Sequence, residues 1–410
     1  MYEKSKNYND ILDCRKDFPA LKRIQNGFPL AYLDGPAGTQ VPEKVLDAMV
    51  HYYLTCNANT HGQFVTSSET DKIIQNARTV VAEFLGASSH TEISFGANMT
   101  TLNYALSRAI GRYFNKGDKI LITQLDHEAN RGPWLSLRDQ GFVVSEVNLN
   151  PDGTLDYDDF MNKITESTRL VAIGYASNAL GTVNDVALIR KLTHKVGAWL
   201  LVDAVHYAPH FPLKVKELGV DFLLCSAYKF YGPHVGILFA RQGLLDMLPT
   251  DCLRTQEQQA PYKIETGTLN HPALEGVRAA IEYIASFGSG FDLRARLVSA
   301  MERIADYEHQ LAKAAYDELA AIPNVQLFGP KFESAQRAPT IAFTVQNKTP
   351  TEVCAALDDK GICAWDGHFY AIRPMEILGL LYRGGVVRIG ISIYNTSDEI
   401  SRFLKEVREL

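Results

Sequence analysis

Long apolar segments, an excess of positive charge and a secretion signal are all missing from this 410-residue chain. No apolar run approaches the ~20 residues that a membrane-spanning helix requires, so nothing indicates an integral membrane protein. The 41 Lys and Arg are outnumbered by 47 Asp and Glu, and a net charge of −6 gives no electrostatic reason to expect a nucleic-acid or anionic-membrane partner. Residues 1–18 lack the apolar core of a signal peptide, and we therefore expect a cytoplasmic protein.

Cysteine is also scarce, with six residues in the whole chain. No two of them form a CxxC pair, and they do not cluster with histidines at the spacing of a metal site. We therefore expect no metal site and no disulfides, and we expect most of the thiols to be small core residues. The six positions are Cys14, Cys56, Cys225, Cys252, Cys354 and Cys363.

What the chain does contain is a long alternation of short apolar strands with helices. This alternation favours an α/β fold with a mostly parallel sheet that is covered on both faces. Strands are predicted at 118–123, 142–147, 168–174, 198–203, 220–225 and 235–240, and helices at 42–54, 68–85, 99–112, 130–139, 156–164, 185–195 and 273–286.

A second α/β set follows a glycine-rich break at residues 288–290. Because 410 residues suffice for one large and one small domain, we predict a large domain at 26–287 and a small α/β domain made of 1–25 and 288–410. The small domain is expected to contain a long helix at 293–321, strands near 340–346, 362–366 and 385–391, and helices at 350–359 and 396–409.

Two neighbouring strands of the large domain end in unusual charged residues. The apolar run Trp199–Val202 leads into Asp203, and a second run at 222–225 leads through Ser226 to Lys229, just before an aromatic-Gly-Pro turn. One interpretation is a turn-capping acid and a solvent-facing lysine. The apolar flanks favour buried parallel strands instead, whose carboxyl ends form the sites of open α/β sheets.

A lysine and an acid in this layout are expected when pyridoxal phosphate (PLP) is bound. Lys229 would form a Schiff base with the cofactor, and its freed amine would move protons at the substrate α-carbon. Asp203 would pair with the pyridine nitrogen and keep it protonated. The sequence therefore predicts a PLP site built on Lys229 and Asp203.

Further candidates lie at the ends of other predicted strands. His127 follows an apolar strand, where its ring is placed either to stack on the cofactor or to bond to the backbone of a turn. The run Asn98-Met99-Thr100 opens a helix, whose first N–H groups favour a phosphate, although Asn and Thr are also routine helix caps. Ser226 is expected to donate to the same phosphate.

Arg388 stands alone within the apolar strand GGVVRIGISIY. An arginine in such a place requires an anion, and the planar fork of the guanidinium suits a substrate α-carboxylate. An internal ion pair with an Asp or Glu is the alternative.

Taken together, these residues resemble the class V aminotransferase family of fold-type I PLP enzymes, in particular its cysteine desulfurase and selenocysteine lyase branch. The resemblance covers nearly the whole chain. It includes the stretches YLDGPAGTQVP near the start, ANTHG at 58–62, DHEAN at 126–130, YASNALGTVND at 175–185, VDAVH at 202–206, SAYKFYGPHVG at 226–236, ETGTLN at 265–270 and VRIGISIYNTSDE at 387–399.

The resemblance implies a role for each matching position. Lys229, Asp203, His127, Ser226 and Arg388 match residues with the roles given above. It further implies that Asn178 contacts cofactor and substrate, that His61 lies on the substrate side, that His206 replaces a glutamine near the phenolic oxygen of the cofactor, that Tyr228 replaces a histidine among the cofactor ligands, and that Thr268 reaches the phosphate in a neighbouring subunit. A homodimer with shared sites is therefore expected.

One departure from the family pattern concerns the loop that carries the nucleophilic cysteine in group II desulfurases, which reads roughly R-x-G-x-H-C-A. Aligned on Gly367 and His368, the cysteine position holds Tyr370 and the arginine position holds Trp365. A phenol cannot accept sulfur as a persulfide, and Cys363 lies seven residues before Tyr370 in a predicted strand.

We therefore expect a PLP enzyme that acts on an α-amino acid without a protein persulfide, as a lyase for carbon–sulfur cleavage or β-elimination. Arg388 and Asn178 would hold the substrate carboxylate, and Tyr370 or His368 would protonate the leaving group. Alternatives are an aminotransferase or epimerase, a cysteine desulfurase that uses another thiol, and a non-catalytic PLP-binding protein.

Overall fold

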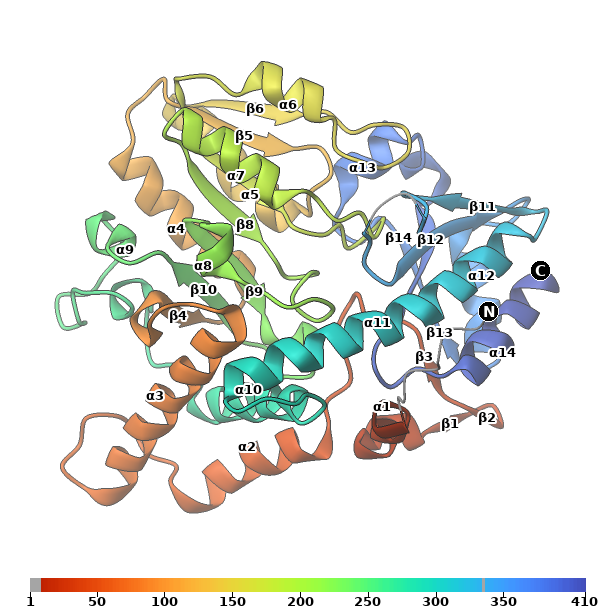
Figure 1. Ribbon diagram of the computed structural model, residues 1–410, viewed down its shortest axis with the longest axis horizontal. Coiled ribbons are helices and arrows are strands. Elements are labelled where there is room, and N and C mark those ends of the chain that lie inside the picture. The colour runs from red at the N-terminus through yellow and green to blue at the C-terminus, as the bar shows by residue number, and fades with distance from the viewer. Residues whose placement is uncertain (1–8, 334–335) are drawn as a thin grey trace.

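The computed structural model describes residues 9–333 and 336–410. Residues 1–8, which fall within the predicted small domain, lie outside the described part. Within the described part, no helix combines the length and apolar character that crossing a bilayer demands. A large sheet with its helices and a smaller sheet with its own helices lie side by side, and the long helix α11 (Leu293–Ala320) runs from one to the other (Figure 1).

The large sheet has seven strands in the order β4-β10-β9-β8-β7-β5-β6. The five strands from β9 to β6 pair in parallel, whereas β10 is antiparallel to both of its neighbours. The prediction of a mostly parallel sheet is confirmed. The strands are β4 (Ile93–Gly96), β5 (Lys119–Thr123), β6 (Val143–Val147), β7 (Thr168–Gly174), β8 (Trp199–Asp203), β9 (Phe222–Ser226) and β10 (Gly236–Ala240).

Both faces of this sheet are buried, because its strands are apolar on both sides. Leu200, Val202 and Leu223 face one hydrophobic cluster, and Leu201 and Leu224 face the other, as the alternation along a strand requires. The first cluster includes residues of α3 (Val65–Leu85), α6 (Tyr157–Lys163), α7 (Val186–Lys195), α8 (Val215–Leu218), α10 (His271–Ala285) and α11; the second includes residues of α4 (Met99–Tyr113), α5 (Glu128–Leu135) and α9 (Leu244–Met247). Helix α2 (Glu43–Thr55) packs on α10.

The smaller sheet has four antiparallel strands in the order β11-β12-β15-β14. Buried side chains of this sheet pack against α11, α12 (Pro350–Asp358) and α14 (Ser397–Arg408). The strands are β11 (Val325–Phe328), β12 (Thr340–Val345), β14 (Trp365–Gly367) and β15 (Val386–Gly390). Strand β11 and helix α13 (Ile372–Ile377) were not predicted from the sequence. Short elements α1 (Asn9–Asp13), β1 (Ile24–Gln25) and β2 (Phe28–Pro29) precede the first sheet.

Two predicted elements were wrong in their limits. The strand expected at 362–366 is divided: β13 (Ile362–Cys363) pairs in parallel with β3 (Ala31–Tyr32), and β14 pairs with β15 instead. The helix expected at 130–139 begins at Glu128 and ends at Leu135, because the His127 side chain accepts a hydrogen bond from the Ala129 N–H and so caps the helix earlier. Strand β3 lies inside the range predicted for the large domain, and the boundaries at 26–287 stay a prediction.

The topology brings the ends of five strands that build the site to one edge of the large sheet. The parallel strands β5, β7, β8 and β9 all end there, and β4 ends there too, because it is related to β9 by two reversals of direction through β10. Gly236 of β10 is essential to this arrangement, since a Cβ atom at that position would lie 2.3 Å from the carbonyl carbon of Asn98. The N-terminus of α4 can therefore lie directly against the sheet edge.

Candidate active site

A cavity opens at this edge of the sheet and is lined by apolar and polar side chains together, as small-molecule sites are. Its walls are made largely by the segments that follow β4, β5, β7, β8 and β9. The residues from the sequence prediction that line it are Asn98, Met99, Thr100, His127, Asn178, Asp203, His206, Ser226, Tyr228 and Lys229. The structure thus brings together ten predicted residues that are spread over 132 positions of the chain.

Lys229 lies in a single helical turn directly after β9 and is buried. Its Nζ donates hydrogen bonds to the carbonyl oxygens of Pro36 and, at 3.0 Å, Ala37. Burial, reinforced by the positive charge of Arg388, lowers the pKa of Lys229 to about 7. The amine is therefore uncharged in a large share of molecules near neutral pH, which is the form that attacks a carbonyl carbon.

Asp203 ends β8 and is buried beside the same cavity. Its Oδ1 accepts a hydrogen bond from the Val205 N–H at 2.9 Å, so it also has the turn-capping role that was the alternative interpretation. Burial raises the pKa of Asp203 to about 7. A cationic ring nitrogen placed next to this carboxyl group would favour its ionised form.

Asp126 is a cavity residue to which the sequence interpretation gave no role. Its Oδ1 accepts a hydrogen bond from the Gly174 N–H at 2.8 Å, and its Oδ2 accepts one from Asn130 at 3.2 Å. Burial raises its pKa to about 6. Its position after an apolar strand, like that of Asp203, was the signal that could have identified it.

The N-terminus of α4 forms the part of the cavity predicted to hold phosphate. Asn98 is the helix cap, because its side chain accepts a hydrogen bond from the Thr101 N–H at 2.9 Å. The Ser226 hydroxyl accepts a hydrogen bond from the Met99 N–H at 3.1 Å and so connects the end of β9 to this helix. Asn98 can therefore cap the helix while the same helix start binds a phosphate, since backbone N–H groups at a helix start attract anions whichever side chain caps them.

Both roles that the sequence offered for His127 apply in the structure: the residue bonds to the backbone of a turn, and it lies at the cavity. Its Nδ1 accepts a hydrogen bond from the Ala129 N–H at 2.9 Å, which is the turn contact, and its side chain lines the cavity. Burial lowers the pKa of His127 to about 4, so the ring is a neutral imidazole. Its centroid lies 5.6 Å from the centroid of the Tyr370 ring.

Arg388 is fully buried, and the side chains that line the cavity do not include it. One Nη donates to Asp34 Oδ1 at 2.9 Å and the other to the Asn178 carbonyl oxygen at 3.1 Å. The Phe369 ring covers the guanidinium, with its centroid 4.1 Å from Cζ. The internal ion pair that was the alternative for Arg388 is therefore present, and the sequence interpretation missed Asp34, which follows β3 more than 350 residues earlier.

The loop from Gly367 to Tyr370 closes this side of the site. Gly367, Phe369 and Tyr370 have φ angles of 113°, 52° and 57°, which are strained for the two aromatic residues. Asn178 Nδ2 donates to the Phe369 carbonyl oxygen at 2.9 Å, and the Glu128 N–H donates to the Tyr370 carbonyl oxygen at 2.8 Å. Asn178 follows β7 and Glu128 begins α5, so the two contacts attach the loop backbone to the large-sheet part of the molecule.

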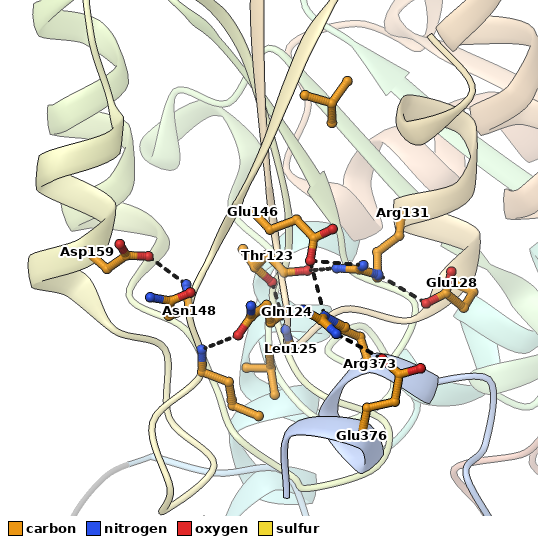
Figure 2. Close-up of polar contacts among 12 residues, drawn as sticks. Thr123, Gln124, Leu125, Glu128, Arg131, Glu146, Asn148, Asp159, Arg373 and Glu376 are labelled. Carbon is orange, nitrogen blue, oxygen red and sulfur yellow. Dashed lines mark hydrogen bonds and ion pairs between the residues drawn. The ribbon is translucent and has the colours of Figure 1, made fainter. Parts of the chain in front are cut away.

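Polar side chains fasten the segment that follows this loop, as Figure 2 shows. Arg373, in α13, places its Nε 3.3 Å from Glu146 Oε2, and the same oxygen lies 3.2 Å from Nη2 of Arg131. Arg131 also contacts Glu128 at 3.0 Å. These contacts join α13 to β6 and α5, and the sequence interpretation missed them because Glu146 and Arg373 are 227 positions apart.

Besides Arg388, four predicted residues do not line the cavity. His368 and Tyr370 lie on the loop, where the Tyr370 side chain is 60% exposed. Thr268 lines a separate pocket with Ala97. His61 is exposed, with Nδ1 3.3 Å from an oxygen of Asp71.

The residues of the cavity fit PLP. It offers a buried amine, buried carboxyl groups, a neutral imidazole and a helix N-terminus. In addition, the buried Nδ1 of His206 has no hydrogen-bond partner among the described residues, which leaves a polar atom for a ligand to satisfy.

Comparisons with known proteins agree with this fit. The family model for class-V aminotransferases matches residues 31–403. A cysteine desulfurase from Enterobacter sp. (strain 638) is 34% identical over 97% of each chain. A probable cysteine desulfurase from Mycolicibacterium paratuberculosis is 35% identical over 98% of this chain, which spans 58% of that longer protein.

Solved structures show the same relationship. The apo structure of a cysteine desulfurase from Thermococcus onnurineus NA1 has a TM-score of 0.87 and 30% identity, covering 97% of both chains. The cysteine desulfurase CsdA from Escherichia coli has a TM-score of 0.84 and 26% identity, covering 99% of this chain and 98% of the other. The chain therefore belongs to the class-V aminotransferase family, with the fold of the type I PLP-dependent enzymes, and is itself a PLP-dependent enzyme.

Proposed function

We propose that this enzyme is a lyase that acts on an α-amino acid, by carbon–sulfur cleavage or β-elimination, without a persulfide on the protein. The observation that carries the proposal is the absence of a usable thiol at the site. Among the described residues, none of the six cysteines lines the cavity. In an alignment on Gly367 and His368, Tyr370 stands where the desulfurase loop pattern has its cysteine. Cys363 lies in β13, and burial raises the pKa of its thiol to about 11, which disfavours the reactive thiolate.

Proton removal at the substrate α-carbon is assigned to Lys229. Bound PLP supplies an electron sink for the charge that develops at this carbon. The uncharged amine of Lys229, whose pKa burial lowers to about 7, suits a general base near neutral pH. Asp203 faces the same cavity, where its carboxylate would keep a pyridine nitrogen protonated.

The substrate carboxylate is assigned to Arg388 and Asn178. Arg388 has five N–H donors, and its Nε has no partner among the described residues. Arg388 is fully buried and does not line the cavity, so this assignment requires the side chains around the guanidinium to open. Asn178 lies on the cavity wall and holds the Phe369 backbone, which makes it the connection between the cavity and the loop.

Protonation of the leaving group is assigned to the loop. The Tyr370 N–H donates to Nδ1 of His368 at 3.1 Å, so the proton of a neutral His368 ring resides on Nε2 and is available to donate. The Tyr370 hydroxyl is the second candidate, since its side chain is largely exposed and its ring faces His127.

A homodimer with shared sites is also proposed. Thr268 and His61 do not face the cavity of their own chain, which supports a role in the site of a second copy. Large apolar side chains are exposed on and beside α2 and at the start of α3, as is common at interfaces between subunits. They are Leu46, Val50, Tyr53, Leu54, Phe64 and Val65.

Aminotransferase and epimerase activities are the alternatives, and the names of the relatives favour one further candidate, a cysteine desulfurase that uses another thiol. The products separate these functions. β-Elimination from cysteine yields sulfide, pyruvate and ammonia, whereas desulfuration yields alanine and a protein-bound sulfur, transamination a keto acid and epimerisation the opposite enantiomer.

The test is incubation of PLP-loaded enzyme with a panel of amino acids that carry a β-leaving group, followed by quantification of all these products. We expect equal amounts of pyruvate and ammonia, with sulfide where the substrate contains sulfur, and no product from Lys229→Ala. Alanine together with persulfide on a cysteine of this chain would overturn the proposal in favour of a desulfurase.

A further inference from the structure

A buried polar chain connects the cavity to the long helix α11. His206, on the cavity wall, places Nε2 2.9 Å from the Thr340 hydroxyl of β12. The ring of His210 lies 5.3 Å from that of His206, edge to face. Nδ1 of His210 is in turn 2.7 Å from Glu308 Oε2 of α11. All four side chains are buried, and two of them come from elements that follow the predicted domain break at 288.

Glu308 requires a proton-bearing partner. The residue is completely buried and its Oε1 has no hydrogen-bond partner among the described residues, so an isolated carboxylate would be costly. Burial raises the pKa of Glu308, although His210 opposes that shift. The hydrogen bond between Glu308 and His210 therefore offsets part of this cost, and it fixes the orientation of the His210 ring.

His206 is surrounded by groups that oppose its protonation. Burial is the largest cause, and the charges of His210, Lys229 and Arg388 add to it, so that the pKa of His206 is well below its ordinary value. Asp126 and Asp203 face the same cavity and are the nearby acids of the large sheet. The ring is thus neutral and carries a single N–H.

Nδ1 of this neutral ring can be either a donor or an acceptor, depending on the hydrogen bond that Nε2 makes. A threonine hydroxyl both donates and accepts. If Thr340 donates to Nε2, the proton of His206 is on Nδ1, and if Thr340 accepts, Nδ1 is bare. Nδ1 has no partner among the described residues. A glutamine, which the resemblance leads one to expect at this position, has a fixed N–H donor and a fixed carbonyl acceptor. It cannot change one into the other as the two tautomers of histidine do.

We propose that Glu308, His210 and Thr340 are positioning residues for His206, which they hold as a neutral imidazole whose Nδ1 has no protein partner and is available for a hydrogen bond to a ligand in the cavity. His206 thereby becomes a second polar group besides Lys229 that contacts this ligand. Its state depends on α11 and β12 being docked on the large sheet, because Glu308 and Thr340 belong to them. The inference deepens the proposed function and rests on it only for the identity of the ligand that Nδ1 meets.

The first test is an NMR titration of the full-length protein without added cofactor, with labelled histidine rings and with His206→Gln to assign the resonance. In the unmodified chain we expect His206 to stay neutral from pH 5 to 9. In Glu308→Gln the carboxyl partner of His210 is replaced by an uncharged amide, and we expect the protonation midpoint of His206 to move upward by about one pH unit or more. Glu302→Gln is the matched control, since Glu302 is exposed on the same helix.

A second variant keeps the test decisive if Glu308→Gln fails to fold. Thr340→Val replaces the hydroxyl by a methyl group of nearly the same shape, and we expect the ring nitrogen shifts of His206 to show a changed distribution of its proton between Nδ1 and Nε2. An ordinary midpoint near 6.5 in the unmodified chain would overturn the inference. So would a His206 resonance that neither Glu308→Gln nor Thr340→Val alters.

The cofactor-loaded protein gives an independent readout. The absorption spectrum of bound PLP depends on nearby protons, so we expect the pH midpoint of its colour change to differ between Glu308→Gln and Glu302→Gln. Equal midpoints in the two variants would contradict a connection between Glu308 and the cavity. Colour that survives Lys229→Ala would instead contradict the cofactor attachment, while the cofactor-free titration would still stand.

Discussion

The two sides of the cavity are built in different ways. The wall that contains Asp203 and Lys229 consists of residues that follow neighbouring strands, and each side chain is placed by its own short segment. Beside the cavity is a loop at 367–370, whose backbone is held by Asn178 and Glu128 and whose Phe369 ring covers Arg388. One side is therefore fixed by sheet topology, and the other by side-chain contacts over long sequence separations.

The two parts are therefore expected to have different roles: the strand ends in attaching the cofactor, and the loop in substrate specificity. Groups that attach the cofactor must stay rigid, and strand ends in a buried sheet supply that rigidity. The loop contains two aromatic residues in strained left-handed conformations, and such strain persists only where the surroundings impose it. Variants on the first side should therefore abolish chemistry, whereas variants on the second should change substrate handling and loop motion.

The largest effect is expected from Lys229→Ala. Without the amine, turnover should fall by about 10²–10⁴-fold or more, and the yellow colour of the PLP-loaded protein should be lost. Absorbance spectra and product formation measure both. The exposed Lys191 supplies the control Lys191→Ala, which should leave both readouts unchanged. Unaltered colour in Lys229→Ala would show that the rigid wall has been assigned to the wrong residue.

Arg388 tests the second side. Replacing it by Met leaves the partly buried carboxylate of Asp34 without its partner, which should lower the free energy of unfolding by at most about 3–5 kcal/mol. Urea unfolding measures this loss, and the double variant Arg388→Met/Asp34→Asn should recover most of it. Turnover should fall in Arg388→Lys while PLP stays bound. Full activity in Arg388→Lys would leave the Asp34 ion pair as the only role of this arginine.

The pH dependence of cofactor attachment tests the environment of Lys229. Only the uncharged amine reacts, and burial lowers its pKa to about 7. The fraction of free amine then rises about tenfold between pH 6 and 8 and levels off above that. A lysine with its ordinary pKa of ~10.5 would show a rise of about a hundredfold over the same interval with no plateau. Stopped-flow absorbance with cofactor-free protein distinguishes the two curves.

The smallest effect is expected from the contacts that fasten α13. Arg373→Gln removes the ion pair with Glu146, and because Arg373 is partly exposed, the stability should change by less than about 1 kcal/mol. Hydrogen exchange at residues 367–371 should nevertheless become faster. Glu376→Gln, which removes the other partner of Arg373, is the control and should leave this exchange rate unaltered. Equal rates in both variants would mean that the loop does not depend on the Glu146 contact.

The same contrast explains what the sequence could predict. Strand ends such as Asp203 and Lys229 stand out because apolar runs precede them, so the sheet and the wall built on it could be predicted. Asp34 carries no such signal for Arg388, since the pairing depends on β3 meeting β13 across more than 300 residues. The Glu308–His210 pair could likewise not be predicted, because the sequence of the charge-rich helix α11 does not show which of its glutamates is buried when the helix packs on the large sheet.

The attachment of PLP to Lys229 is the claim on which everything else depends, and chemical trapping tests it most directly. The cofactor-loaded protein is reduced with borohydride and digested, and the peptides are analysed by mass spectrometry. We expect a single peptide with a reduced pyridoxyl adduct, and fragmentation should place the adduct on Lys229. An adduct on any other lysine, or none in a protein that has taken up PLP, would contradict the account.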